Sequence, residues 1–111
     1  MDSKRILEEQ IIMAIKTVED PEIPVNIYEL GLIYDIDIKD AGGGWDGKYN
    51  VEIEMTLTSP NCPVAESLPE EVRTKVANLA DVNECKVNIV FDPPWGKEFM
   101  SEEAQLELGI L

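Results

Sequence analysis

The chain has 111 residues, of which 44% are hydrophobic. This length and composition predict one folded domain over residues 1–111 with a modest core. The 23 acidic and 9 basic residues give a net charge of −14, which argues against binding to a nucleic-acid phosphate backbone. No run of about 18 apolar residues is present, and the N-terminus has no signal-peptide core. We therefore expect a cytoplasmic protein that does not bind a membrane.

The reactive side chains are few. The chain has no histidine, and its two cysteines are Cys62 and Cys85. Without histidine, Ser-His-Asp and Cys-His catalysis are excluded within the chain, as are histidine-based zinc and iron sites. Two thiols cannot complete a four-cysteine metal or cluster site.

A helix is predicted over residues 3–19, because apolar residues recur there at helical spacing. They are Leu7, Ile11, Ala14, Ile15 and Val18. Pro21 must end this helix. The loop that follows carries two carboxylates, Asp20 and Glu22, and two prolines that fix its shape. These carboxylates are either simply solvated or held toward a site by the rigid loop.

A hairpin is predicted next. Residues 32–39 and 48–58 alternate between apolar and polar, and a glycine-rich turn separates them. Apolar residues on one face of the first strand are Leu32, Tyr34, Ile36 and Ile38. Gly31, just before this strand, indicates a bend or a close approach of the backbone to another segment. A third strand is predicted over residues 86–91. We interpret Cys85 at its start as structural unless the fold brings it close to Cys62.

The turn between the second strand and the second helix contains Cys62. The helix is predicted over residues 63–80, and Pro63 suits its first position. This arrangement puts Cys62 at or near the N-cap, where unpaired N–H groups and the helix dipole lower a thiol pKa. Such a thiol is reactive or binds metal, and the alternative is a small, buried, inert cysteine. Pro69 either kinks the helix or begins its main part.

The last part of the chain has an abrupt stop and a short helix. Two prolines before Trp95 end the third strand. Trp95 either covers the edge of the core or, together with Phe99, offers an aromatic docking surface to a partner. A helix is predicted over residues 101–108, with Ser101 as its N-cap.

These elements predict a two-layer α+β domain in the order helix-strand-strand-helix-strand-helix, with a small three-stranded mixed sheet and helices on one face. A crossover between the second and third strands makes them parallel. We expect the first strand to lie between them.

Three stretches, in this order and spacing, resemble the SufT and PaaD-like family of iron–sulfur assembly proteins. The first joins Asp20-Pro21-Glu22 to Leu30-Gly31-Leu32-Ile33-Tyr34, the second is Met55-Thr56-Leu57-Thr58-Ser59-Pro60-Asn61-Cys62-Pro63, and the third is Phe91-Asp92-Pro93-Pro94-Trp95. The resemblance covers about residues 5–110 of the chain.

The resemblance implies a non-enzymatic role in maturing iron–sulfur proteins, as a carrier of a transient cluster or as an adaptor. The implied partners are other assembly proteins and apo-target proteins. The family's cysteine falls on Cys62, the implied metal ligand, while its acidic loop falls on Asp20 and Glu22 and its hydroxyl pair on Thr58 and Ser59. PaaD-type members serve assembly of a phenylacetyl-CoA oxygenase and usually carry a cysteine-rich C-terminal segment. This chain lacks that segment, so it resembles the SufT branch more.

Two further hypotheses stay open. A permanent cluster would need thiolates from outside the chain, and a homodimer that brings two Cys62 side chains together is one arrangement that supplies them. We expect no permanently bound cofactor. The chain could instead be a thiol-dependent protein that uses a low-pKa Cys62, or an interaction module that docks through Trp95 and Phe99.

Overall fold

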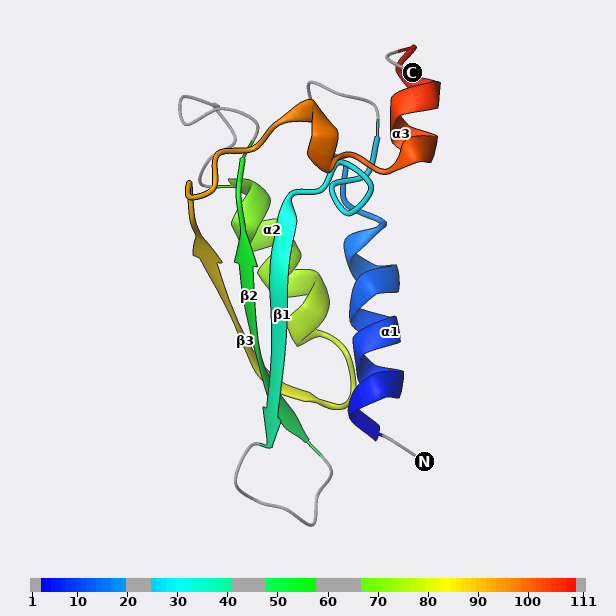
Figure 1. The fold of residues 1–111 in the computed structure, drawn as a ribbon. Coiled ribbons are helices and arrows are strands. Elements are labelled where there is room, and N and C mark those ends of the chain that lie inside the picture. The colour runs from blue at the N-terminus through cyan, green and yellow to red at the C-terminus, as the bar shows by residue number, and fades with distance from the viewer. Residues whose placement is uncertain (1–2, 20–24, 41–47, 58–66, 110–111) are drawn as a thin grey trace.

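The computed structural model describes residues 3–19, 25–40, 48–57 and 67–109. These residues form α1 (Ser3–Ile15), β1 (Ile33–Asp40), β2 (Tyr49–Met55), α2 (Ser67–Ala77), β3 (Val82–Ile89), the 3-10 helix η1 (Lys97–Phe99) and α3 (Glu102–Glu107). The order and the mixed sheet confirm the predicted α+β fold (Figure 1). No helix of the described residues is both long and apolar enough to cross a bilayer.

The sheet has the strand order β1-β2-β3. β1 pairs antiparallel with β2, and β2 pairs parallel with β3, as the predicted hairpin and crossover require. The expectation that the first strand lies in the middle is wrong. The hairpin places β1 on one edge of β2, and the connection through α2 returns the chain to the other edge, so that Ile53 of β2 pairs with both Ile36 and Val87.

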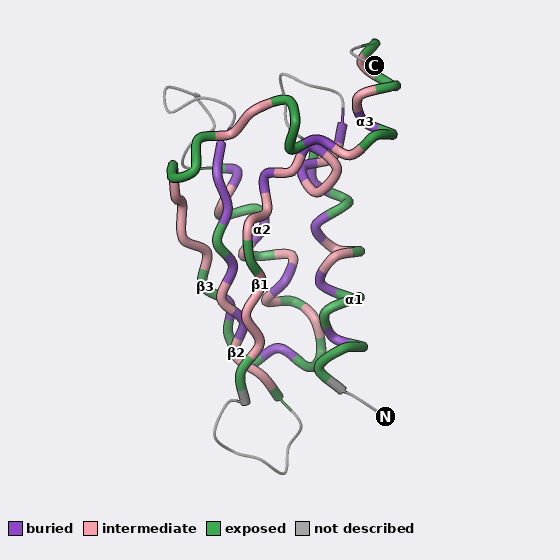
Figure 2. The backbone as a smooth tube through the Cα atoms, viewed as in Figure 1, coloured by how far each residue is buried: buried purple, intermediate pink, exposed green. Residues whose placement is uncertain are grey.

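The core lies between the sheet and the two longer helices. α2 packs against β3, and α1 packs mainly against α2 and only lightly against β1. Buried residues follow β2 and the side of α1 that faces the sheet (Figure 2). Those with no exposed surface include Leu7, Ile11, Ile15, Ile53, Met55, Val72 and Val76. The other face of the sheet is polar and has exposed charges such as Asp35, Glu54 and Glu84.

Several element boundaries differ from the prediction because tertiary pairing overrides the local pattern. α1 ends at Ile15, and the Val18 carbonyl instead accepts a hydrogen bond from the Ile27 amide at 2.9 Å. β3 begins at Val82, four residues early, because it pairs along β2 from Tyr49 onward. Cys85 therefore lies inside β3. Pro69 lies in the first turn of the described part of α2, where its missing N–H is tolerated.

Gly31 makes the close backbone approach that its position predicted. Its φ is +80°, in the left-handed region, and a Cβ there would overlap the carbonyl oxygen of Phe99. Gly109 has a similar φ of +74°, but no atom lies within 4 Å of its virtual Cβ. Both glycines therefore have a backbone conformation that is strained for other residues, and only Gly31 would also suffer steric overlap if it carried a side chain.

Gly31→Ala should destabilise the fold more than Gly109→Ala. A left-handed alanine costs about 1–2 kcal/mol at either position, and overlap with Phe99 adds about 1–3 kcal/mol at Gly31 alone. Urea denaturation of both variants measures the difference in the free energy of unfolding. Equal losses would show that the approach of Phe99 to Gly31 is not a tight contact.

Candidate functional site

The flanks of the acidic loop are fixed, although the loop itself is not described. Asp20 and Glu22 lie outside the described residues. On either side of them, Glu19 forms a β-bridge with Asn26, and Ile27 is hydrogen-bonded to Val18. These pairings close the chain into a loop whose two ends are held side by side.

The start of the cysteine stretch is fixed at the same end of the molecule. The Thr56 amide donates to the Leu32 carbonyl at 2.8 Å, and the Val90 amide donates to the Met55 carbonyl at 2.9 Å. Thr58, Ser59 and Cys62 lie outside the described residues, so the N-cap position of Cys62 stays a prediction. The ends of α1, β2 and β3 and the beginning of β1 meet at this end (Figure 1).

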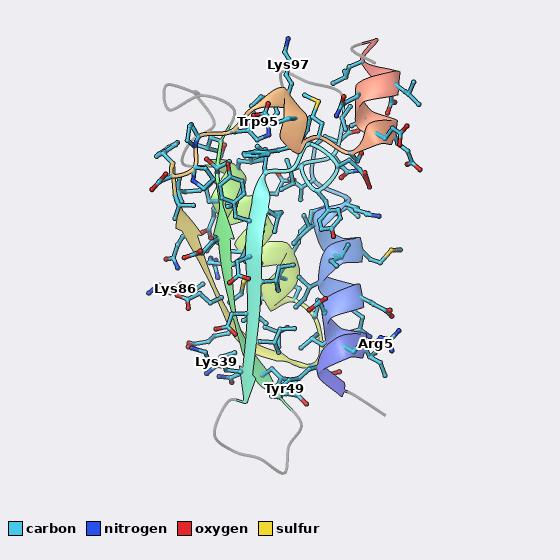
Figure 3. The ribbon with its side chains drawn as sticks, viewed as in Figure 1. Arg5, Lys39, Tyr49, Lys86, Trp95 and Lys97 are labelled. Atoms are coloured by element: carbon cyan, nitrogen blue, oxygen red, sulfur yellow. The ribbon has the colours of Figure 1, made fainter. Side chains whose placement is uncertain are left out.

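The segment that follows β3 is hydrogen-bonded to the residues just before β1. The Trp95 indole Nε1 donates to the Leu30 carbonyl at 2.8 Å, and the Ser101 amide donates to the Glu29 carbonyl at 2.8 Å. Trp95 is half-buried, packs against the core and lies where β1 begins (Figure 3). Trp95 therefore covers the core edge, which was one of its two predicted roles. Ser101 caps α3 as predicted, and its side chain accepts from the Ala104 amide.

Phe99, in contrast, is exposed. It is 37% exposed, and its ring meets the Tyr34 ring edge-to-face with centroids 5.8 Å apart. The two rings border a shallow hollow of about 430 Å³, which we call the Phe99 surface. It is lined by Gly31, Ile33, Tyr34, Pro93 and Phe99.

Sequence reasoning missed the contribution of Tyr34 to this surface. Ile33 pairs with Met55 and Asp35 with Glu54, which leaves Tyr34 as the extra residue of a bulge. Its hydroxyl donates to the Pro93 carbonyl at 2.8 Å. The pKa of Tyr34 is raised, mainly by burial and further by the negative charge of Glu98. Simple alternation gave no sign of the bulge.

Thr56 was also missed. Its side chain is fully buried, although alternation put it with the polar residues of its strand. Among the described residues, no hydrogen-bond partner reaches its Oγ1. Its position at the start of the cysteine stretch, directly before Leu57, is the signal that could have drawn attention to it.

Cys85 is a buried thiol. It is 8% exposed inside β3, and burial raises its pKa to about 11, although the positive charge of Arg73 acts in the opposite direction. A neutral, buried thiol is a poor nucleophile and a poor metal ligand. No group of three or more cysteine or acidic side chains suited to a metal ion occurs within the described ranges.

Comparison with known proteins defines the class to which this domain belongs. Residues 8–89 match a family model described as "Iron-sulfur cluster assembly protein". The match covers most of the chain, and the chain belongs to this family. The membership confirms the resemblance drawn from the three sequence stretches.

Within the family, the chain is similar to maturation factors of the SufT type. It is 51% identical over 104 residues to "Fe-S protein maturation auxiliary factor" of Porphyromonas gingivalis, covering 94% of this chain and 92% of that protein. It is 37% identical to "Fe-S protein maturation auxiliary factor SufT" of Staphylococcus aureus, and the match covers 82% of this chain and 96% of that protein. A solved structure of a domain of unknown function from Bacillus anthracis superposes with a TM-score of 0.81 at 38% identity. The superposition covers 96% of this chain and 95% of that chain.

The pKa of Cys85 can be tested in a Cys62→Ala background, where it is the remaining thiol. Its alkylation by iodoacetamide should be slow in the folded protein and should increase toward pH 11, because burial raises its pKa to about 11. In urea the rate should follow an ordinary thiol pKa of about 8.5. Folded and denatured profiles that coincide would contradict the burial of Cys85.

The raised pKa of Cys85 also predicts that the free energy of unfolding depends on pH. A raised folded pKa means that the unfolded chain loses the Cys85 proton first, so stability should fall as pH rises from about 9 to about 11. Denaturation of Cys62→Ala against Cys62→Ala/Cys85→Ala isolates this contribution. A difference between the two that does not change over this pH range would contradict the shift.

Proposed function

We propose that this chain assists the maturation of iron–sulfur proteins as a carrier or adaptor and not as an enzyme. The observation that carries the proposal is its 51% identity, along almost the full length of both chains, to a protein named as an Fe–S maturation auxiliary factor. The fold supports the proposal, because the flanks of the acidic loop and of the cysteine stretch are held at one end of the domain.

Cys62 is the thiol that we assign to this role. Cys85 is buried, its pKa is raised to about 11, and it is therefore unsuited to bind cargo. Iron or a cluster, as transient cargo, would bind the Cys62 thiolate, with Asp20, Glu22, Thr58 and Ser59 lining the site. One thiolate per chain favours release, and any further ligands come from a second copy, an assembly protein or the apo-target.

The Phe99 surface is where we propose that a protein partner docks. Phe99 is exposed beside Tyr34, whereas the Trp95 indole donates a hydrogen bond to the Leu30 carbonyl and packs against the core. Exposed aromatic side chains in a shallow apolar hollow are typical anchors of protein interfaces. In this assignment Trp95 supports the surface and Phe99 makes the contact with an apo-target or another assembly protein.

Cys62→Ala should abolish the function without changing the fold. In cells that lack the native chain, this variant should fail to restore the activity of iron–sulfur enzymes, whereas Cys85→Ala should restore it. Enzyme activities in extracts, normalised to the level of the variant protein, are the measurement. Restoration by Cys62→Ala to the level of the native chain would remove Cys62 from the mechanism.

Phe99→Glu should weaken binding of a partner by tenfold or more, because loss of an interface anchor typically costs about 2 kcal/mol or more. Met13→Glu is the matched control, since Met13 is 68% exposed on α1. The probe is the apo form of an enzyme whose activity fails in cells without this chain, titrated by calorimetry under anaerobic conditions. Equal affinities of the two variants would exclude the Phe99 surface as the docking site.

A further inference from the structure

The free edge of β1 faces a groove that the described parts of the chain leave open. β1 is an edge strand, and among the described residues its ladder partner is β2 alone. Two adjoining hollows of about 280 and 290 Å³ lie between β1 and α1 and share Glu8 and Ile36 in their walls. Together they form one groove, the β1–α1 groove, which reaches from Tyr28 to Ile38.

At the β1 edge, the layer of helices extends beyond the sheet, because α1 lies past β1 (Figure 1). α2 packs against β3, whereas α1 packs on α2 and contacts β1 only lightly. α1 therefore stands beside β1 and not behind it (Figure 1). A further strand added to the β1 edge would lie over the side of α1 that carries Ile12, and would extend the two-layer packing.

We propose that the β1 edge binds an extended segment of another protein by β-augmentation. An edge strand presents unpaired N–H and C=O groups that a peptide in the extended conformation can pair with. Ile36 and Ile38 are half-buried, line the groove and would contact every second side chain of the added strand. These alternate side chains should be apolar.

Charge on the other face of β1 determines the chemistry of the bound segment. Asp35 and Asp37 alternate with Ile36 and Ile38, so they belong to the polar face of the sheet, opposite Glu54 and Glu52 of β2. Asp37 also forms an ion pair with Lys39 at 3.3 Å, which makes Asp35 the main negative charge that β1 offers to an added strand. The remaining positions of the added strand would lie opposite these aspartates, and cross-strand pairs of opposite charge are favourable. The segment should therefore alternate lysine or arginine with apolar residues.

A second copy of this chain fits the edge less well. Antiparallel pairing of two β1 strands about Ile36 would place Asp35 opposite Asp37 twice, and like charges directly opposite are destabilising. Each copy also carries a net charge of −14. Both arguments favour a basic segment of a different protein over self-association through β1.

The probe is the peptide acetyl-Lys-Val-Lys-Val-Lys-Val-Lys-amide, titrated into the full chain and followed by NMR. Backbone amides of β1 should shift and gain protection from hydrogen exchange, and an analogue that is N-methylated at every residue should not bind. Asp35→Lys should weaken binding about fivefold, because a favourable cross-strand charge pair is replaced by an unfavourable one. Glu84→Lys is the control, since Glu84 is exposed on β3 at the other edge and undergoes the same charge change.

Three results would overturn the proposal. One is the absence of any peptide binding at millimolar concentration. Another is equal weakening by Asp35→Lys and Glu84→Lys, or undiminished binding of the N-methylated analogue, which would mean general attraction to an acidic protein. The third is protection of β1 amides that increases with protein concentration without peptide, which would identify a second copy as the occupant.

Discussion

The close contact between Gly31 and Phe99 is the constraint on which the functional end of this domain depends. Because residue 31 has no side chain, the backbone at Phe99 can approach it directly. That approach allows the Trp95 indole to reach the Leu30 carbonyl and the Ser101 amide to reach the Glu29 carbonyl. A segment distant in sequence thereby covers the end of the sheet and positions both Phe99 and α3.

The same constraint connects the two stretches that carry the proposed chemistry. Leu32, next to Gly31, is hydrogen-bonded to Thr56, which lies at the start of the cysteine stretch. On the other side, Asn26 and Ile27 are paired with Glu19 and Val18 and close the acidic loop. The chain thus brings the flanks of both stretches, together with the Phe99 surface, to one end of the sheet. A maturation factor needs such an arrangement if cargo and protein partner are to meet.

The sequence predicted the element types well, because amphipathic periodicity reports directly on burial of residues such as Ile11 and Ile53. It failed where distant pairing decides the outcome: the central place of β2, the early start of β3 at Val82, and the bulge that makes Tyr34 part of a surface. Gly31 and Ser101 were predicted correctly because each has a local stereochemical cause. For the site, motif resemblance points to Cys62 and its neighbours, which lie outside the described residues and stay predictions. No local pattern could separate a half-buried Trp95 from an exposed Phe99.

Anaerobic reconstitution with iron and sulfide tests the assignment of Cys62 most directly. Iron content, visible absorption and mass in solution should be compared for the native chain, Cys62→Ala and Cys85→Ala. We expect the native chain and Cys85→Ala to take up iron or a cluster and Cys62→Ala not to, and the mass will show whether two chains share the cargo. Equal loading of Cys62→Ala and the native chain would contradict the assignment of Cys62, and so would loss of loading in Cys85→Ala alone.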